Sequence, residues 1–377
     1  MSVVRFRRIV LCLLLCLPLS GCWDYHRVND RAQVTGIAVD PDPDNSHHVI
    51  FTLHVPIFSQ SSNSSGSNMS GSGSAKHYKN FTVSCGTLST ALSELQTRNS
   101  KEFYLASLQV LILNEHLQDK QIERVVASIM GNMSSDKLAF IFMTPETAAG
   151  FLSGSSIDEP VDDLVNVFSR VRQSGYTVRR RTWEFWRDTT QPGINPTTAM
   201  LRSSPEGFDV GGAVVFEGFQ PVCELPMQDV VYYNIILGKL KNMAISFEYN
   251  DSDFELLHIK STSKRFVRQV HGHLQLVLKI LLKGDLDVNA TNGEIEVSPQ
   301  DMQLYEKAVE TTVEQHTIEV IRACQRNKVD PFGFGLRDMV VHPKDASIIS
   351  NHWSTLFSSA QIDVRVKAEI GHKGALN

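Results

Sequence analysis

Cys22 is the residue of this sequence whose setting most clearly predicts a chemical step. It ends the tetrapeptide Leu-Ser-Gly-Cys at residues 19–22, behind an apolar run at residues 9–19 that contains Pro18 and follows three arginines. Basic, apolar and small residues in this order are typical of an export signal, and a cysteine directly after the small pair is typical of bacterial lipoproteins. We therefore expect residues 1–21 to be removed as a lipoprotein signal peptide and the Cys22 thiol to receive a diacylglycerol.

A transmembrane helix is the competing interpretation of this run, and a secretory signal without a lipid is another. A membrane-spanning helix needs about 20 apolar residues, whereas residues 9–19 number only 11. Stable anchoring takes two acyl chains or an equivalent pair of signals, and a diacylglyceryl cysteine supplies both chains. The expected product is an ectodomain held by its lipid on the outer face of a membrane.

Motifs for other chemistry do not occur in the sequence. It has no phosphate loop, no nucleophile elbow, no H-E-x-x-H and no EF-hand loop. His271 and His273 could hold a metal from one face of a strand, but no further ligand stands at a suitable spacing, so exposed histidines are favoured. We therefore predict no enzyme activity, no cofactor and no metal site.

Three cysteines remain after the signal peptide and Cys22: Cys85, Cys223 and Cys324. They are far apart and form no C-x-x-C, so buried, unreactive thiols are expected for most of them; whether one pair forms a disulfide stays open. A net charge of −5 argues against a nucleic-acid partner. The basic clusters at 179–181 and 264–265 are expected to be solvated ends of strands or helices.

The first half alternates strand and helix patterns, which predicts a mixed sheet with packed helices. We assign residues 22–195 to an N-terminal α/β domain, interrupted by a Ser/Gly-rich loop at 59–74 and ended by the breakers at 191–196. The expected strands are 33–39 and 49–57 (a hairpin), 80–85, 108–113 and 137–143, and the expected helices are 87–98, 115–130, 147–152, 159–172 and 182–190.

The second half is richer in strands. A hairpin at 211–225 marks a small middle β-rich domain at 196–240, and residues 241–377 are expected to form a C-terminal α+β domain with a long helix at 299–327. That domain should contain one long alternating strand at 267–282, a hairpin turning at Asn292-Gly293 and a terminal strand at 362–370. The predicted fold class is α+β, as a multidomain ectodomain of mixed β-sheets with packed helices.

Several short motifs, in order along the whole chain, resemble one family. Cys22-Trp23-Asp24 is followed by Gly36-Ile37-Ala38-Val39-Asp40, the G-x-A-V-F-like segment at 211–216, residues 330–336 and Trp353-x-x-x-Phe357. This order resembles the Ger(x)C proteins, the lipoprotein C subunits of bacterial spore nutrient germinant receptors. The chain departs from that pattern at Arg27, Arg31 and Ser107, where Glu, Leu and His would be expected.

The resemblance implies a role without catalysis. Members of that family have several mixed α/β domains and act with two multispanning partners, the A and B subunits, in the inner spore membrane, where a sensed nutrient triggers release of ions and dipicolinic acid. We therefore expect a membrane-tethered scaffold required for nutrient-triggered germination; whether this subunit contacts the germinant stays open. The alternative is a solute-binding lipoprotein of a nutrient transporter, which should show two similar lobes of repeated β-α units.

Overall fold

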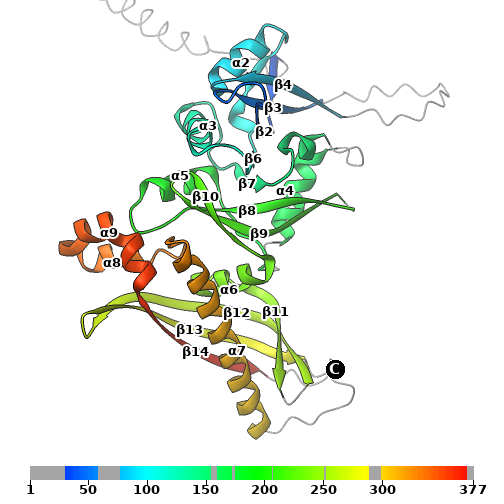
Figure 1. Cartoon of the computed structure of the whole chain (residues 1–377). Coiled ribbons are helices and arrows are strands. Elements are labelled where there is room, and N and C mark those ends of the chain that lie inside the picture. Colours follow the sequence, from blue (N-terminus) through cyan, green and yellow to red (C-terminus); the bar gives the residue numbers. More distant parts are fainter. Residues whose placement is uncertain are drawn as a thin grey trace, which may run out of the picture.

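Two large β-sheets lie one beyond the other along the molecule, each covered by helices (Figure 1). The computed structural model describes residues 30–57, 77–153, 159–171, 175–205, 207–249, 252–287 and 299–371. A short parallel pair, β1 (Arg31–Gln33) and β5 (Glu102–Tyr104), lies beside the first sheet.

The first sheet has eight strands in the order β10-β9-β8-β7-β6-β2-β3-β4. The pairings from β2 through β6 and β7 to β8 are parallel, and the pairings outside them are antiparallel. The strands are β2 (Gly36–Pro41), β3 (Val49–Pro56), β4 (Tyr78–Cys85), β6 (Val110–Asn114), β7 (Phe140–Thr144), β8 (Thr197–Ser204), β9 (Gly207–Glu217) and β10 (Gln220–Leu225).

Strands β6 and β7 are central because their residues are apolar on both faces. Every residue of both strands is buried. Leu111 and Leu113 face the core under α2 (Leu88–Gln96), α3 (Asp119–Gly131) and α5 (Thr182–Thr190), whereas Val110 and Ile112 face the core under η4 (Ala148–Leu152) and α4 (Pro160–Val171). A strand covered on both faces by helices needs such a continuous apolar run.

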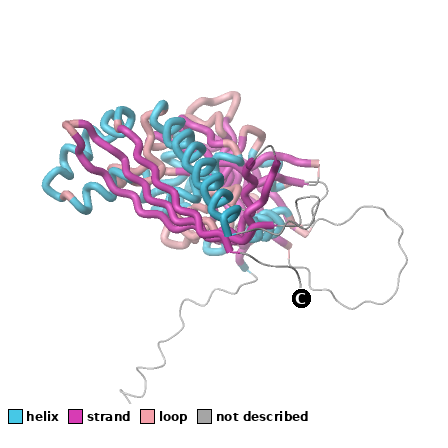
Figure 2. Tube along the Cα trace, turned by 90° about the horizontal axis from the view of Figure 1, so that it is seen from below, coloured by secondary structure: helices cyan, strands magenta, loops and turns pink. Residues whose placement is uncertain are grey.

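The second sheet has four strands in the order β11-β12-β13-β14. The strands are β11 (Lys241–Tyr249), β12 (Ser252–Val270), β13 (His273–Asp287) and β14 (Gln361–Gly371). The long helix α7 (Pro299–Arg326) lies across one face of this sheet (Figure 2), where Val309, Val313 and Val320 join its core. The helices α8 (Phe334–Val341) and α9 (Ala346–Ser359) then lead to β14.

Helix α6 (Met227–Leu237) lies between the two sheets and joins their cores. Its buried residues Val230, Tyr233 and Ile236 belong to one apolar cluster with Val215 of β9 and Leu278 of β13. The helix is apolar on nearly all sides because it is packed on nearly all sides. The end of the first sheet therefore shares its core with the second sheet.

Most elements predicted from periodicity are confirmed. β2 and β3 form the expected antiparallel hairpin, β6, α3 and β7 form the expected β-α-β unit, and α7 and β14 agree with the predicted helix and terminal strand to within one residue. The α+β class with mixed sheets is also confirmed.

The single long strand expected at 267–282 is wrong. The chain reverses at His271 and Gly272, whose φ angles are 51° and 82°, and Val270 pairs with His273. Two residues at positive φ make the primed turn that suits a two-residue hairpin. His271 and His273 therefore do not share a face of one strand.

Other expectations lie outside the described residues or stay open. The signal peptide with Cys22, the Ser/Gly-rich loop at 59–74 and the Asn292-Gly293 turn lie outside the described residues. The predicted boundary between 195 and 196 falls between α5 and β8, inside the span of the eight-stranded sheet. The division into domains at 22–195, 196–240 and 241–377 stays a prediction.

Gly193 lies where the two halves of the chain pack too closely for a side chain. Its φ is +75°, and a Cβ atom there would lie 2.5 Å from the backbone carbon of Gly335. We expect Gly193→Ala to lower the free energy of unfolding by about 2–4 kcal/mol, from backbone strain plus overpacking, measured by urea unfolding of the full-length chain in detergent.

Gly218→Ala is the matched control for this variant. Gly218 also has a positive φ, +61°, but a Cβ there meets nothing within 4 Å. Gly218→Ala should therefore lower the free energy of unfolding only through backbone strain at the positive φ, by about 1 kcal/mol. Equal losses from the two variants would show that the contact with Gly335 is unimportant.

Candidate functional site

Two loops from distant parts of the chain meet between the sheets, and we call residues 193–196 with residues 330–336 the seam. The N–H of Asn195 donates to the carbonyl of Asp330 (2.9 Å), and the N–H of Asp330 donates to Oδ1 of Asn195 (2.8 Å). The N–H of Leu336 donates to the carbonyl of Gly193 (2.8 Å), and Nδ2 of Asn195 donates to the carbonyl of Phe216 at the end of β9 (2.9 Å). The seam therefore fastens the C-terminal segment to the first sheet.

The carboxylate of Asp330 lies at the centre of the seam and is 1% exposed. It accepts hydrogen bonds from the N–H groups of Phe332 (3.1 Å), Gly333 (2.9 Å) and Gly335 (3.0 Å), and from Nε1 of Trp353 (2.9 Å). Burial raises the pKa of Asp330 to about 6, against the opposing effect of these donors. At neutral pH the group is therefore a buried carboxylate that orders the loop before α8.

Arg180 is a second buried charge, next to the seam. Its Nε donates to Oγ1 of Thr197 (2.9 Å), its Nη2 donates to the hydroxyl of Tyr233 (3.1 Å), and a carboxylate oxygen of Asp188 lies 3.8 Å away. Burial disfavours its charge, but Tyr233 and Asp188 outweigh that effect and raise the pKa of Arg180 above its ordinary value. The Tyr233 hydroxyl also lies 3.4 Å from the carbonyl of Pro331, so this network reaches the seam.

The expectation of solvated basic clusters is therefore wrong for Arg180, which is 5% exposed. It is also wrong for Arg265, which is half-buried and whose Nη1 donates to the carbonyl of Ile236 near the end of α6 (2.7 Å). In both cases the guanidinium bonds to groups from distant parts of the chain, which local sequence does not reveal.

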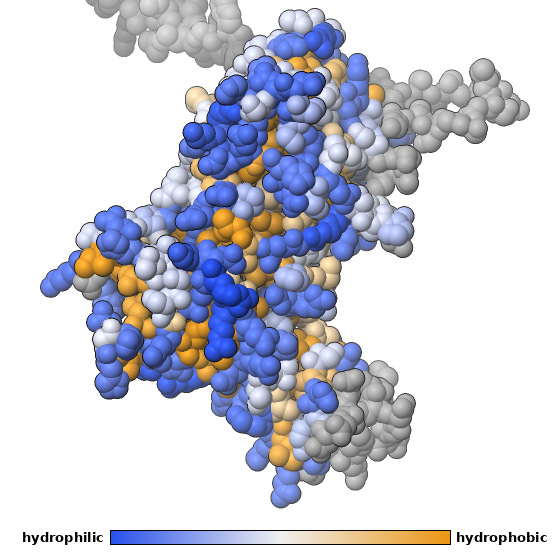
Figure 3. Space-filling model, viewed as in Figure 1, coloured by the Kyte–Doolittle hydropathy of each residue, from blue (hydrophilic) through white to orange (hydrophobic). Residues whose placement is uncertain are grey.

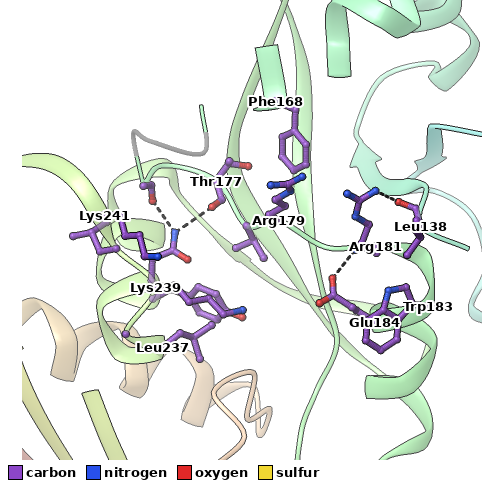
Figure 4. A pocket seen from close by; sticks show the side chains of 16 residues that line it. Leu138, Phe168, Thr177, Arg179, Arg181, Trp183, Glu184, Leu237, Lys239 and Lys241 are labelled. Carbon is purple, nitrogen blue, oxygen red and sulfur yellow. Dashed lines mark hydrogen bonds between the residues drawn. The ribbon is translucent and has the colours of Figure 1, made fainter. Parts of the chain in front are cut away.

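A cavity of about 630 Å³ opens beside this network, and we call it the waist cavity. Figure 4 shows Arg181 and Trp183 on one side of it and Lys239 and Lys241 on the other. Arg179 and Thr177 lie between these two sides. The cavity therefore joins residues that precede β8 to residues that follow α6.

Helix α6 fixes the segment at 175–181, which forms one wall of the waist cavity. Nδ2 of its Asn234 donates to the carbonyls of Gly175 (2.8 Å) and Thr177 (3.1 Å). The side chain of Arg181 donates to the carbonyl of Leu138, and its guanidinium lies 4.0 Å from the centre of the Phe140 ring. These contacts fix the extended segment at 175–181, which carries both arginines of the lining.

The three cysteines among the described residues are free thiols: Cys85, Cys223 and Cys324. Cys85 is buried and donates to a carboxylate oxygen of Glu94 (3.5 Å), and burial raises the pKa of its thiol. Cys223 and Cys324 lie in contact, where a hydrogen bond between the thiols lowers the pKa of Cys223 and raises that of Cys324. Buried thiols are confirmed for Cys85 and Cys324, while Cys223 is half-buried.

Among the other residues that sequence reasoning singled out, Cys22 lies outside the described residues. His271 and His273 are exposed at a hairpin turn. Over the described ranges, no three His, Cys, Asp or Glu side chains come together to hold a metal ion. In the same part of the chain no helix is both long and apolar enough to cross a membrane.

Sequence reasoning missed the buried hydrogen-bonding roles of Asp330, Asn195 and Arg180. One signal was present for Asp330, because the acid precedes Pro-Phe-Gly-Phe-Gly and can cap several N–H groups of such a tight turn. No signal marked Asn195 or Arg180, since their partners lie far away in the sequence.

Apolar side chains also gather on the outer surface of α8 and α9 (Figure 3). Val340 and Val341 of α8 are 75% and 65% exposed, and Ile348 of α9 is 57% exposed. Neighbouring aliphatic side chains that stay in water commonly mark an interaction surface. The Asp330 carboxylate orders the start of α8 and so supports this patch.

These observations define an α+β protein whose two sheets are fastened by buried polar groups. Residues 24–203 match the family model described as spore germination protein N-terminal domain, and residues 211–374 match the model described as spore germination B3/GerAC like, C-terminal. The chain belongs to this family of spore germination proteins, as its sequence motifs predict. This membership places it among the subunits of spore germinant receptors.

Individual relatives agree with this assignment. The chain is 20% identical to spore germination protein KC of Bacillus subtilis (strain 168), over 98% of this chain and 96% of that protein. It is 18% identical to spore germination protein GerQC of Bacillus cereus, over 87% and 88% of the two chains. The crystal structure of the GerBC protein is similar in fold, with a TM-score of 0.53 and 15% identity over 89% of this chain and 96% of that chain.

The Asp330 carboxylate should be essential for the stability of the seam. In Asp330→Asn, an amide that itself donates hydrogen bonds replaces a group that accepts four of them. Because buried donors left unpaired cost about 1–3 kcal/mol each, we expect a loss of roughly 2–4 kcal/mol at pH 7 in urea unfolding. Asp119→Asn, at an exposed position of α3, is the control and should change stability little.

The difference in stability between the wild type and Asp330→Asn should change with pH in a definite direction. Since the pKa of Asp330 is about 6 in the folded protein and 3.8 is the ordinary value, the folded state binds this proton more tightly. The contribution of Asp330 to the free energy of unfolding of the wild type therefore rises as the pH falls from 7 to 4, by at most roughly 3 kcal/mol. The gap between wild type and Asp330→Asn should therefore widen on acidification; a gap that narrows would contradict a raised pKa.

Proposed function

We propose that the protein is a non-catalytic, lipid-anchored C subunit of a spore nutrient germinant receptor, tethered through Cys22 to the outer face of the inner spore membrane. Membership of the spore germination family across both halves of the chain is the observation that carries this proposal. The lipobox before Cys22 supports the anchor, because a diacylglyceryl group gives the two chains that stable binding needs.

The seam supports a scaffold role. It joins two sheets through backbone hydrogen bonds and a buried carboxylate, so the described parts of the ectodomain form one firmly connected unit. Tethering such a unit to the membrane makes its docking to membrane partners effectively intramolecular, which raises their local concentration without new contacts. The multispanning A and B subunits are the partners we assign to it, and the exposed patch on α8 and α9 is one surface free for such contact.

The transporter alternative is not favoured. A solute-binding lipoprotein should have two similar lobes of repeated β-α units, whereas the eight-stranded sheet and the four-stranded sheet here differ in strand order and pairing. The family models and relatives also point to spore germination.

Substitution Cys22→Ala tests the anchor. We expect metabolic labelling with a palmitate analogue to be lost, and nutrient-triggered germination of spores to fall severely while the chain still folds, because the lipid rather than the fold supplies membrane attachment. Cys223→Ala removes a different cysteine and should keep both the label and germination. Normal germination of Cys22→Ala spores at a normal protein level would refute the tether.

The partners are tested by affinity purification from detergent-solubilised native spore membranes, with the tag after Asn377 and mass spectrometry of the proteins that co-purify. The scaffold proposal expects two multispanning receptor subunits in roughly constant ratio to the tagged chain. Recovery of a permease with an ATPase instead would establish the transporter alternative. Wild-type spores with an untagged chain provide the background.

A further inference from the structure

The waist cavity has an excess of positive charge, although the whole chain carries a net charge of −5. Among the described residues that line it, the cations are Arg179, Arg181, Lys239 and Lys241, and the one carboxylate is that of Glu184. An oxygen of Glu184 already accepts a hydrogen bond from the backbone N–H of Arg181 (2.9 Å). Arg181, Lys239 and Lys241 alone carry more positive charge than this one carboxylate balances.

Lys239, one of these cations, has a lowered pKa. Its residue is exposed, yet the surrounding protein removes part of the hydration of its ammonium group, and the guanidinium of Arg180, which does not line the cavity, lies near. Together these effects lower the pKa of Lys239 to about 8. A bound anion would offset both effects, since it would supply a counter-charge to the ammonium group.

The rest of the lining is apolar. Leu138, Trp183 and Leu237 contribute ring and aliphatic surface, and Trp183 is 38% exposed. A volume of about 630 Å³ is within the range of pockets that hold small molecules, which are mostly apolar with a few placed polar groups. Inorganic ions alone would leave these apolar walls without contacts.

We propose that the waist cavity is a binding site for a small organic anion, in which a carboxylate or phosphate group meets Arg181 and the two lysines and an apolar body packs on Trp183 and Leu138. Guanidinium groups suit such oxyanions because their N–H donors match the oxygen pair. This inference does not depend on the proposed role as a receptor subunit: the subunit could act without this ligand, and the ligand could bind in another role.

The test is isothermal titration calorimetry of the full-length lipidated chain in detergent micelles. The probes are naphthalene-2-carboxylate, naphthyl phosphate, inorganic phosphate, and naphthalene-2-methanol as the uncharged analogue of the carboxylate. We expect one saturable site for at least one naphthyl anion, and at least tenfold weaker binding of both naphthalene-2-methanol and inorganic phosphate. The stronger of the two naphthyl anions identifies the headgroup.

Two substitutions locate the binding in the cavity. Lys239→Met removes a charge while keeping a long side chain, and should weaken binding of the anion about tenfold or more. Lys241→Met removes a second lining charge in the same way and should also weaken binding of the anion. Lys120→Met, at an exposed position of α3, is the matched control and should bind as the wild type does.

The proposal is overturned if neither naphthyl anion binds at millimolar concentration. It is also overturned if naphthalene-2-methanol or inorganic phosphate binds as well as the organic anions, or if Lys239→Met and Lys241→Met bind like the wild type. Folding of each variant is checked by its melting temperature, so loss of binding in a folded Lys239→Met protein is evidence for the site itself.

Discussion

The buried carboxylate of Asp330 is the interaction on which the arrangement of this protein depends. A charge removed from water is unfavourable unless donors surround it, and here three backbone N–H groups and the Trp353 indole do so. All four donors belong to the residues that follow α7, so the carboxylate fixes the direction in which the chain enters α8. The backbone of the same residue binds Asn195, which in turn binds β9. One residue therefore couples the local turn to the contact between the two sheets.

The apolar cores explain why this polar joint is needed. The hydrophobic effect has no direction, and the cluster that runs from β9 through α6 to β13 would tolerate some sliding of one sheet past the other. Hydrogen bonds do have direction. The seam and the Arg180 network, which links Asp188, Thr197 and Tyr233, select one arrangement of the halves. In the scaffold role that we propose, such a defined arrangement would hold the docking surfaces in fixed positions relative to one another.

The waist cavity is a consequence of the same joint. The segment at 175–181 is held at one end by Asn234 of α6 and at the other by contacts with Leu138 and Phe140, so it carries its arginines along a fixed edge. Lys239 and Lys241 come from the opposite side, where α6 ends and β11 begins. The cations therefore converge because two pieces of the fold meet there, beside the hydrogen-bonded seam.

The sequence by itself determined most of the elements and the family of the chain, and it predicts attachment through Cys22. Alternation and helical spacing predicted β2, β3, α5, α7 and β14 because burial of one face is a local property of a strand or helix. The lipobox at Cys22 and the motif order predicted a lipoprotein of the germination family, whose membership the family models bear out. The prediction of one long strand at 267–282 was wrong because apolar and polar residues alternate on both sides of the two-residue turn. The alternation therefore does not show where the chain reverses.

Only the tertiary structure decided the seam, the buried Arg180 and the waist cavity. Asp330 and Asn195 are 135 positions apart, and Arg180 and Tyr233 are 53 apart. No local pattern carries information on such pairs, because each residue looks like an ordinary solvated polar group until its partner is placed. The cavity depends further on the order of strands in the first sheet, which brings the segment before β8 next to the end of α6. Pairing over these distances is a property of packing, whereas propensity and periodicity are properties of neighbours.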